Sequence, residues 1–85
     1  MKLFHAYAHA NELEIGIVAR SGSHAAQIFL TYWASEYGDA PGAFEITASA
    51  IPYGELQPGL RLLVEGDASG VLLVDERDGA RLVPM

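Results

Sequence analysis

The stretch that decides the fold is HAAQIFLTYWASEYG, residues 24–38. Its apolar side chains recur every three or four residues, the spacing that lines them up along one face of an α-helix. Either Ser21 or Ser23 can cap the first turn by accepting a hydrogen bond from a free backbone N–H group. Gly38 can end the helix because glycine adopts the left-handed conformation without steric cost. The sequence therefore predicts one helix, over about residues 24–37.

On both sides of this helix, apolar and polar residues alternate, which is the period of a half-buried strand. The strands that we expect are residues 2–9, 13–20, 44–50, 60–65, 71–76 and 80–83. The first two are close enough to pair as a hairpin. We therefore expect a single α+β domain over residues 1–85, in the order β-β-α-β-β-β-β. Its single antiparallel sheet of five to six strands would carry the helix on one face.

The last two expected strands are joined by Asp78-Gly79. An Asp-Gly pair between alternating runs is typical of a two-residue type I′ turn. Such a turn fixes the register and places Glu76 opposite Arg81. Opposite charges in that position stabilise a hairpin by about 0.2–1 kcal/mol.

The charge balance bears on the choice of partner. The chain has 11 acidic residues against 5 lysines and arginines, and no lysine or arginine lies between Ser21 and Leu60. The bases are too few and too scattered for a phosphate-binding patch, so we expect no nucleic-acid partner. A basic protein partner is electrostatically easier to attract than an acidic one.

Composition also limits the remaining classes. The chain has no cysteine, so it forms no disulfide and has no Cys-based metal site. No window approaches the roughly 20 apolar residues of a membrane span, and no signal peptide is visible. We therefore expect a cytoplasmic protein without membrane contact. One lysine against four arginines, with much alanine and glycine, is typical of a GC-rich bacterial or phage gene.

The expected helix is unusual because no charged residue lies between Arg20 and Glu36 and the apolar arc covers more than half of its circumference. A helix on one sheet normally has a narrower apolar stripe and a charged outer face. One explanation is that segment 51–60 folds over Leu30 and Tyr37. The other is that this face binds a protein partner or a second copy of the chain. The candidate contact residues are Gln27, Leu30, Thr31, Ala34 and Tyr37.

A second candidate surface lies on the first strand, where His5, Tyr7 and His9 share one face. They form either an ordinary solvated face or a surface for a ligand or partner. At strand spacing, His5 and His9 are about 13 Å apart, too far to hold one metal ion. A helix would instead bring both imidazoles within one turn, with Glu12 as a third ligand. The strand interpretation predicts neither a metal nor a cofactor.

Read as a whole, the layout resembles small proteins encoded by phages and mobile elements, including some anti-CRISPR proteins. The resembling parts are Met1-Lys2-Leu3-Phe4, Ile17-Val18-Ala19-Arg20-Ser21 and Asp78-Gly79-Ala80-Arg81. Members of that set that bind nucleic acid, or proteins that bind nucleic acid, are often basic. This chain departs from them by being acidic. The resemblance implies an inhibitor that occupies a basic protein surface, and it carries over no functional residue.

Three functions follow as hypotheses. We expect first a non-enzymatic protein-interaction module, able to form a homodimer. The first alternative is a phage or mobile-element inhibitor that binds a basic protein surface. The second alternative is a small ligand-binding or catalytic domain that uses His5 and His9.

Overall fold

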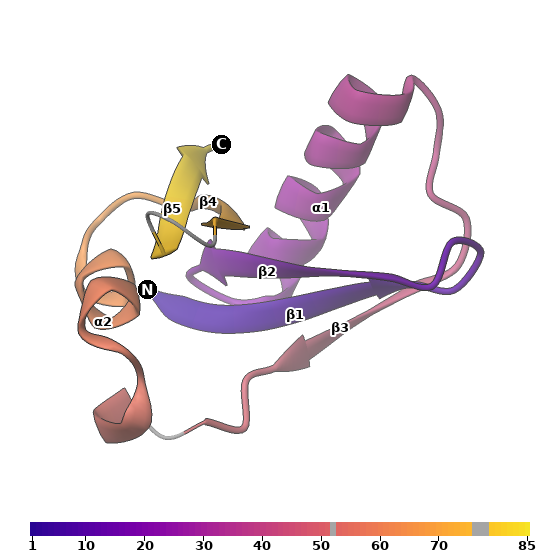
Figure 1. Cartoon of the computed structure of the whole chain (residues 1–85). Helices are drawn as coiled ribbons and strands as arrows, with labels where there is room; N and C mark the ends of the chain where they lie inside the picture. Colours follow the sequence, from indigo (N-terminus) through magenta and orange to yellow (C-terminus); the bar gives the residue numbers. More distant parts are fainter. Residues whose placement is uncertain (52, 76–78) are drawn as a thin grey trace.

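The computed structural model describes residues 1–51, 53–75 and 79–85 (Figure 1). Within these residues, five strands form one antiparallel sheet in the order β3-β1-β2-β4-β5. The elements are β1 (Lys2–Ala8), β2 (Leu13–Ala19), α1 (Gly22–Tyr37), β3 (Phe44–Ala48), the 3-10 turn η1 (Tyr53–Glu55), α2 (Pro58–Glu65), β4 (Gly70–Asp75) and β5 (Gly79–Pro84). The helix α1 packs on one face of the sheet, which confirms the expected α+β fold.

Both ends of α1 are set by the residues that the sequence indicated. The Ser21 hydroxyl accepts a hydrogen bond from the His24 backbone N–H, at 3.2 Å. Gly38 has a φ of 76° in the left-handed region, and its N–H donates to the Ala34 carbonyl oxygen at 2.9 Å. These caps satisfy backbone groups that a helix leaves without partners at its ends.

The main core lies between α1 and one face of the sheet. Phe29 is fully buried, and its ring lies 4.8 Å from that of Phe44 on β3 and 5.6 Å from that of Trp33, between ring centroids. The side chains that β1 contributes to this core are Phe4, Ala6 and Ala8. The two alanines are small, so they leave room for the large rings of α1 over the middle of the sheet.

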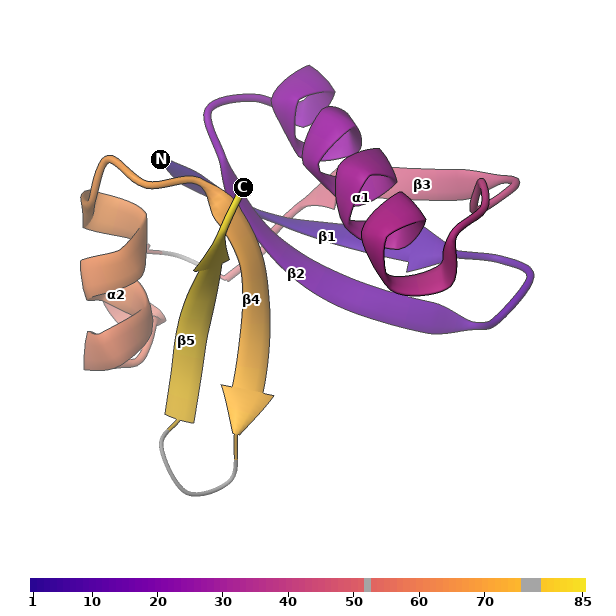
Figure 2. The ribbon, with the colours of Figure 1, turned by 90° about the horizontal axis from the view of Figure 1, so that it is seen from above.

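A smaller buried group lies on the opposite face. Val18 is fully buried although its neighbour Ile17 belongs to the main core, so the two side chains point to opposite faces of β2. Leu56 and Val64 are also buried, and with Leu3 they line a cavity of about 290 Å³. Figures 1 and 2 show α2 beside β5 and away from α1, in agreement with the contacts between α2 and β5.

This arrangement corrects the expectation that segment 51–60 folds over the outer side of the first helix. Leu56 is buried on the α2 side of the molecule, while Leu30 and Tyr37 are 43% and 50% exposed. The chain turns away because β3 is an edge strand paired with β1. Its continuation therefore leaves near the beginning of β1, whereas Tyr37 of α1 lies beside Leu13, at the opposite end of the β1–β2 pair.

The prediction of a strand at residues 60–65 is wrong, because Pro58–Glu65 forms α2. A strand would place Leu60, Leu62 and Val64 on one face, yet Leu62 is 70% exposed and Val64 is buried. Pro58 fits the first turn of a helix, where its fixed φ is already helical and its missing N–H is not needed. In so short a run, the leucines fit the period of a strand and that of a helix, and packing decides which of the two forms.

The predicted register of the last hairpin is also wrong. Arg81 pairs with Leu73, and Asp75 pairs with Gly79, so a two-residue Asp-Gly turn does not join the strands. Glu76, the expected partner of Arg81, lies outside the described residues.

Apolar side chains paired across the two strands explain this register. It places Val71 opposite Val83 and Leu72 opposite Leu82. The two-residue turn would instead have set Leu82 against Asp75. Matching apolar residues across the strands outweighs the local preference of the turn sequence.

We predict that two identical glycine substitutions have opposite effects on stability. A Cβ atom on Gly70 would overlap the backbone carbonyl oxygen of Val83, whereas a Cβ on Gly59 in α2 would meet open space. Gly70→Ala should lower the free energy of unfolding by about 1–3 kcal/mol. Gly59→Ala should raise it by about 0.4–1 kcal/mol. Urea unfolding followed by circular dichroism measures both, and equal effects would contradict the close approach of β4 and β5.

Candidate functional site

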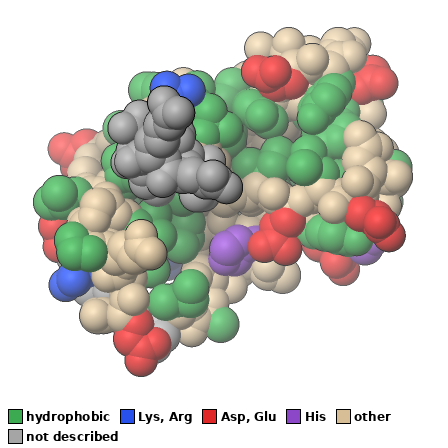
Figure 3. Space-filling view, in the orientation of Figure 1, with side chains coloured by type: hydrophobic (Ala, Val, Ile, Leu, Met, Phe, Trp, Pro, Cys, Tyr) green, Lys and Arg blue, Asp and Glu red, His purple; other side chains and the backbone are tan. Residues whose placement is uncertain are grey.

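The outer face of α1, defined as Gln27, Leu30, Thr31, Ala34 and Tyr37, is exposed along its whole length. The Thr31 hydroxyl donates to the Gln27 carbonyl oxygen at 2.9 Å, so its donor group is already satisfied within the helix. The Tyr37 ring packs on the buried Trp33 ring, with 4.4 Å between centroids, which holds Tyr37 in place. Figure 3 shows hydrophobic side chains in the region of α1, with acidic side chains beside them near one end of the helix. This face is a preformed and largely apolar surface.

A hollow of about 240 Å³ continues this face toward the beginning of α1, where the C-terminal residue Met85 comes close. His24 lines it, and its Nδ1 atom accepts a hydrogen bond from the Arg20 backbone N–H at 3.1 Å. Ser69 holds Met85 in place through two hydrogen bonds, one in each direction. Sequence reasoning missed Met85, because only the folded sheet brings residues 24 and 85 together.

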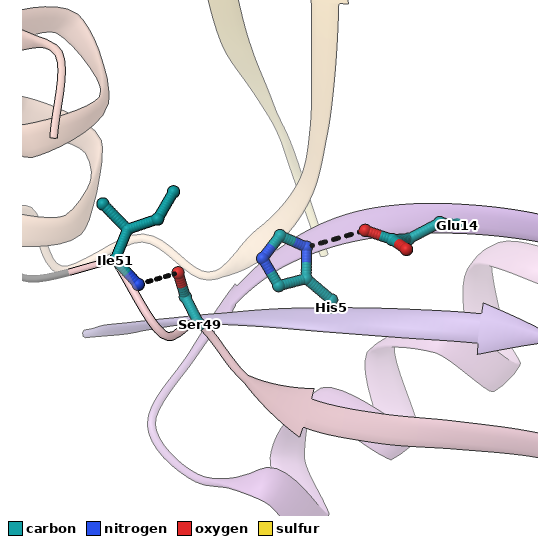
Figure 4. Close-up of polar contacts among 4 residues, drawn as sticks. All are labelled: His5, Glu14, Ser49 and Ile51. Atoms are coloured by element: carbon teal, nitrogen blue, oxygen red, sulfur yellow. Dashed lines mark hydrogen bonds and ion pairs between the residues drawn. The ribbon is translucent and has the colours of Figure 1, made fainter.

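The second candidate surface lies on the face of the sheet away from α1. Tyr7 is paired with Glu14 of β2 and with Glu45 of β3, so the three side chains form a row across three strands. His5 Nδ1 lies 3.3 Å from Glu14 Oε1, and Figure 4 shows this imidazole pointing toward the carboxylate. His9 Nε2 lies 3.4 Å from Glu45 Oε2, and its ring meets that of Tyr7 edge-on at 5.0 Å.

The structure thus brings together the three residues that the sequence indicated and adds two carboxylates that it did not. The Glu14 partnership could have been found from the hairpin register, whereas that of Glu45 depends on which strand β3 joins. His5 and His9 belong to two separate pairs. Across the described part of the chain, no group of three or more His, Asp or Glu residues is placed to hold a metal ion.

A third surface, which the sequence did not indicate, is a cleft of about 330 Å³ where β2 and β4 diverge. Its lining residues are Leu13, Glu14, Ile15, Gly16, Tyr32, Tyr37, Leu72 and Leu73. Burial raises the pKa of the Tyr32 hydroxyl, and the nearby Glu36 and Tyr37 raise it further. This cleft combines apolar walls with aromatic residues from α1.

Comparison of the chain with protein-family models, with curated proteins and with solved structures gave no match. Within residues 1–51, 53–75 and 79–85, no helix has both the length and the apolar character needed to cross a membrane. Function is therefore inferred from the surfaces that this chain presents.

We predict that Tyr32 makes the fold weaker in alkali. Because its pKa is raised in the folded state, the unfolded chain loses the proton first, and stability falls as the pH rises above about 10. Tyr32→Phe should remove this part of the alkaline destabilisation. Urea unfolding at pH values from about 8 to about 11 tests this, and a difference from wild type that does not change with pH would contradict it. Glu36→Gln should lower the pKa of Tyr32 in an ultraviolet titration.

Proposed function

We propose that the chain is a non-enzymatic protein-interaction module that forms a homodimer through the outer face of α1. The observation that carries this proposal is the absence of charge among the five residues of the outer face, together with exposures of 43% for Leu30 and 50% for Tyr37. A helix packed on one sheet normally turns a charged face to water. Exposed apolar side chains on an uncharged face favour contact with another protein surface.

The net charge of the chain favours this face for self-association. Each copy carries a formal charge of −6, so two copies repel each other over most of their surfaces. Contact through the outer face of α1 brings no carboxylate against another, because Glu36 lies near the end of the helix. The repulsion is therefore smallest there, and salt would screen what remains.

The position of Leu30 fits twofold symmetry. Leu30 lies near the middle of α1, which spans Gly22–Tyr37. With a twofold axis at this point, the two helices would pack against each other in opposite directions. Each Leu30 would then lie beside Leu30 of the other copy. Gln27 of one copy would then lie near Ala34 of the other, where the small alanine lets the helices approach closely.

The test of this proposal is Leu30→Glu, which would place two carboxylates together at the centre of the contact. We expect the dimer dissociation constant to rise by about thirtyfold or more, the effect of losing a central contact residue. Sedimentation velocity over a range of concentrations measures it. Gln57→Glu adds one negative charge at an exposed position before α2 and should leave the dimer unchanged. A wild-type chain that stays monomeric, or equal effects of the two variants, would overturn the proposal.

A second candidate function, an inhibitor that binds a basic protein surface, is supported by the row of Glu14, Tyr7 and Glu45 on the open sheet face. Two carboxylates beside an aromatic ring suit a lysine or arginine side chain. A partner captured from the native host and identified by mass spectrometry should then be released between about 0.05 M and 0.5 M salt. It should also bind the double variant Glu14→Gln and Glu45→Gln more weakly. Capture that is affected neither by salt nor by the double variant would contradict this function.

A further inference from the structure

Strand β2 has a full partner on one side only. It pairs with β1 from Leu13 to Ala19, but with β4 only from Gly16 to Val18. Figure 2 shows the β4–β5 hairpin turning away from the β1–β2 hairpin. Among the described residues, 13–15 therefore have a neighbouring strand only on the β1 side. An edge of this kind presents backbone N–H and C=O groups that can pair with another chain.

The open edge lies directly beside the cleft between β2 and β4. Leu13 of β2 and Leu73 of β4 line its walls, and Tyr32 and Tyr37 of α1 line it as well. Leu13, Tyr32 and Leu73 are half-buried and pack against the main core, so these walls are held in place. An apolar pocket beside unpaired backbone is the combination by which proteins accept an extended peptide as an added strand.

The alternation of β2 decides the chemistry of such a peptide. Leu13 and Ile15 point toward α1, while Glu14 between them points to the opposite face and is 62% exposed at its side chain. Among the described residues that line the cleft, none is a lysine or an arginine. In an added strand, every second side chain would thus face apolar groups of the protein. The side chains between them would face the Glu14 carboxylate.

We propose that this cleft binds an extended peptide in which apolar and basic residues alternate, paired as an additional strand with residues 13–15 of β2. Its apolar side chains fill the space lined by Tyr32 and Leu73, and a basic side chain faces Glu14. This binding goes beyond dimer formation through α1. The two surfaces share only Tyr37, so Leu30→Glu leaves the peptide site intact.

The experiment uses a fluorescent peptide of alternating lysine and valine, about eight residues long, with binding followed by polarisation on the full chain carrying Leu30→Glu. We expect saturable binding that shifts the amide resonances of residues 13–15 in a nitrogen-15 spectrum. A peptide of the same composition, with all lysines before all valines, should bind at least about tenfold more weakly. No saturation, equal binding of both peptides, or shifts confined to other elements would overturn the proposal.

Two further comparisons separate strand pairing from attraction by charge alone. N-methylation of alternate peptide residues along one edge should weaken binding about tenfold, because it removes hydrogen-bond donors, whereas methylation along the other edge should not. Glu14→Gln should weaken binding about two- to fivefold, and Glu65→Gln in α2, which removes the same charge, should not. Equal effects of the two methylation patterns, or of the two glutamine variants, would contradict the proposed strand pairing. Repeating the titration with the wild-type chain shows whether dimer formation competes, so failure of one proposal is distinguishable from failure of the other.

Discussion

The packing of Phe29 against the alanine-lined middle of the sheet is the interaction on which the rest of the structure depends. Phe29 is fully buried, and so are Ala6 and Ala8 of β1. Burying one such ring stabilises a fold by about 1.5–3 kcal/mol. Its contact with Phe44 also holds the edge strand β3, so one side chain joins the helix to a strand that follows it in sequence. In a chain of 85 residues with no disulfide, few other contacts can replace it.

This packing determines which surfaces remain free. Because α1 buries the side that carries Phe29, its opposite side faces outward with no charge. Helix α2 covers only part of the other sheet face, around Val64, so the row of Glu14, Tyr7 and Glu45 stays open. The strands β2 and β4 stay paired only from Gly16 to Val18, and beyond that point they separate into a cleft. All three surfaces therefore follow from the way α1 and α2 cover the two faces of a sheet with a diverging hairpin.

The sequence by itself determined the features that depend on neighbouring residues. Gly38 marks the end of α1, and Ser21 was one of the two serines indicated as its cap, because capping is a local hydrogen-bonding requirement. The alternation in the first strand placed His5 and Tyr7 away from the helix, because side chains in a strand point to opposite faces in turn. The uncharged outer side of α1 was also visible, since a helical wheel needs only the helix itself.

Only the tertiary structure decided features that depend on distant partners. The leucines of 60–65 fit a strand and a helix equally well, and the burial of Val64 with the exposure of Leu62 selected the helix. The register of β4 and β5 follows apolar pairing along both strands rather than the Asp-Gly sequence at the turn. Glu45 lies beside Tyr7 only because β3 joins β1, and the cleft exists only because β4 leaves β2. In each case several local arrangements have similar energies, and contacts between residues far apart in sequence select one of them.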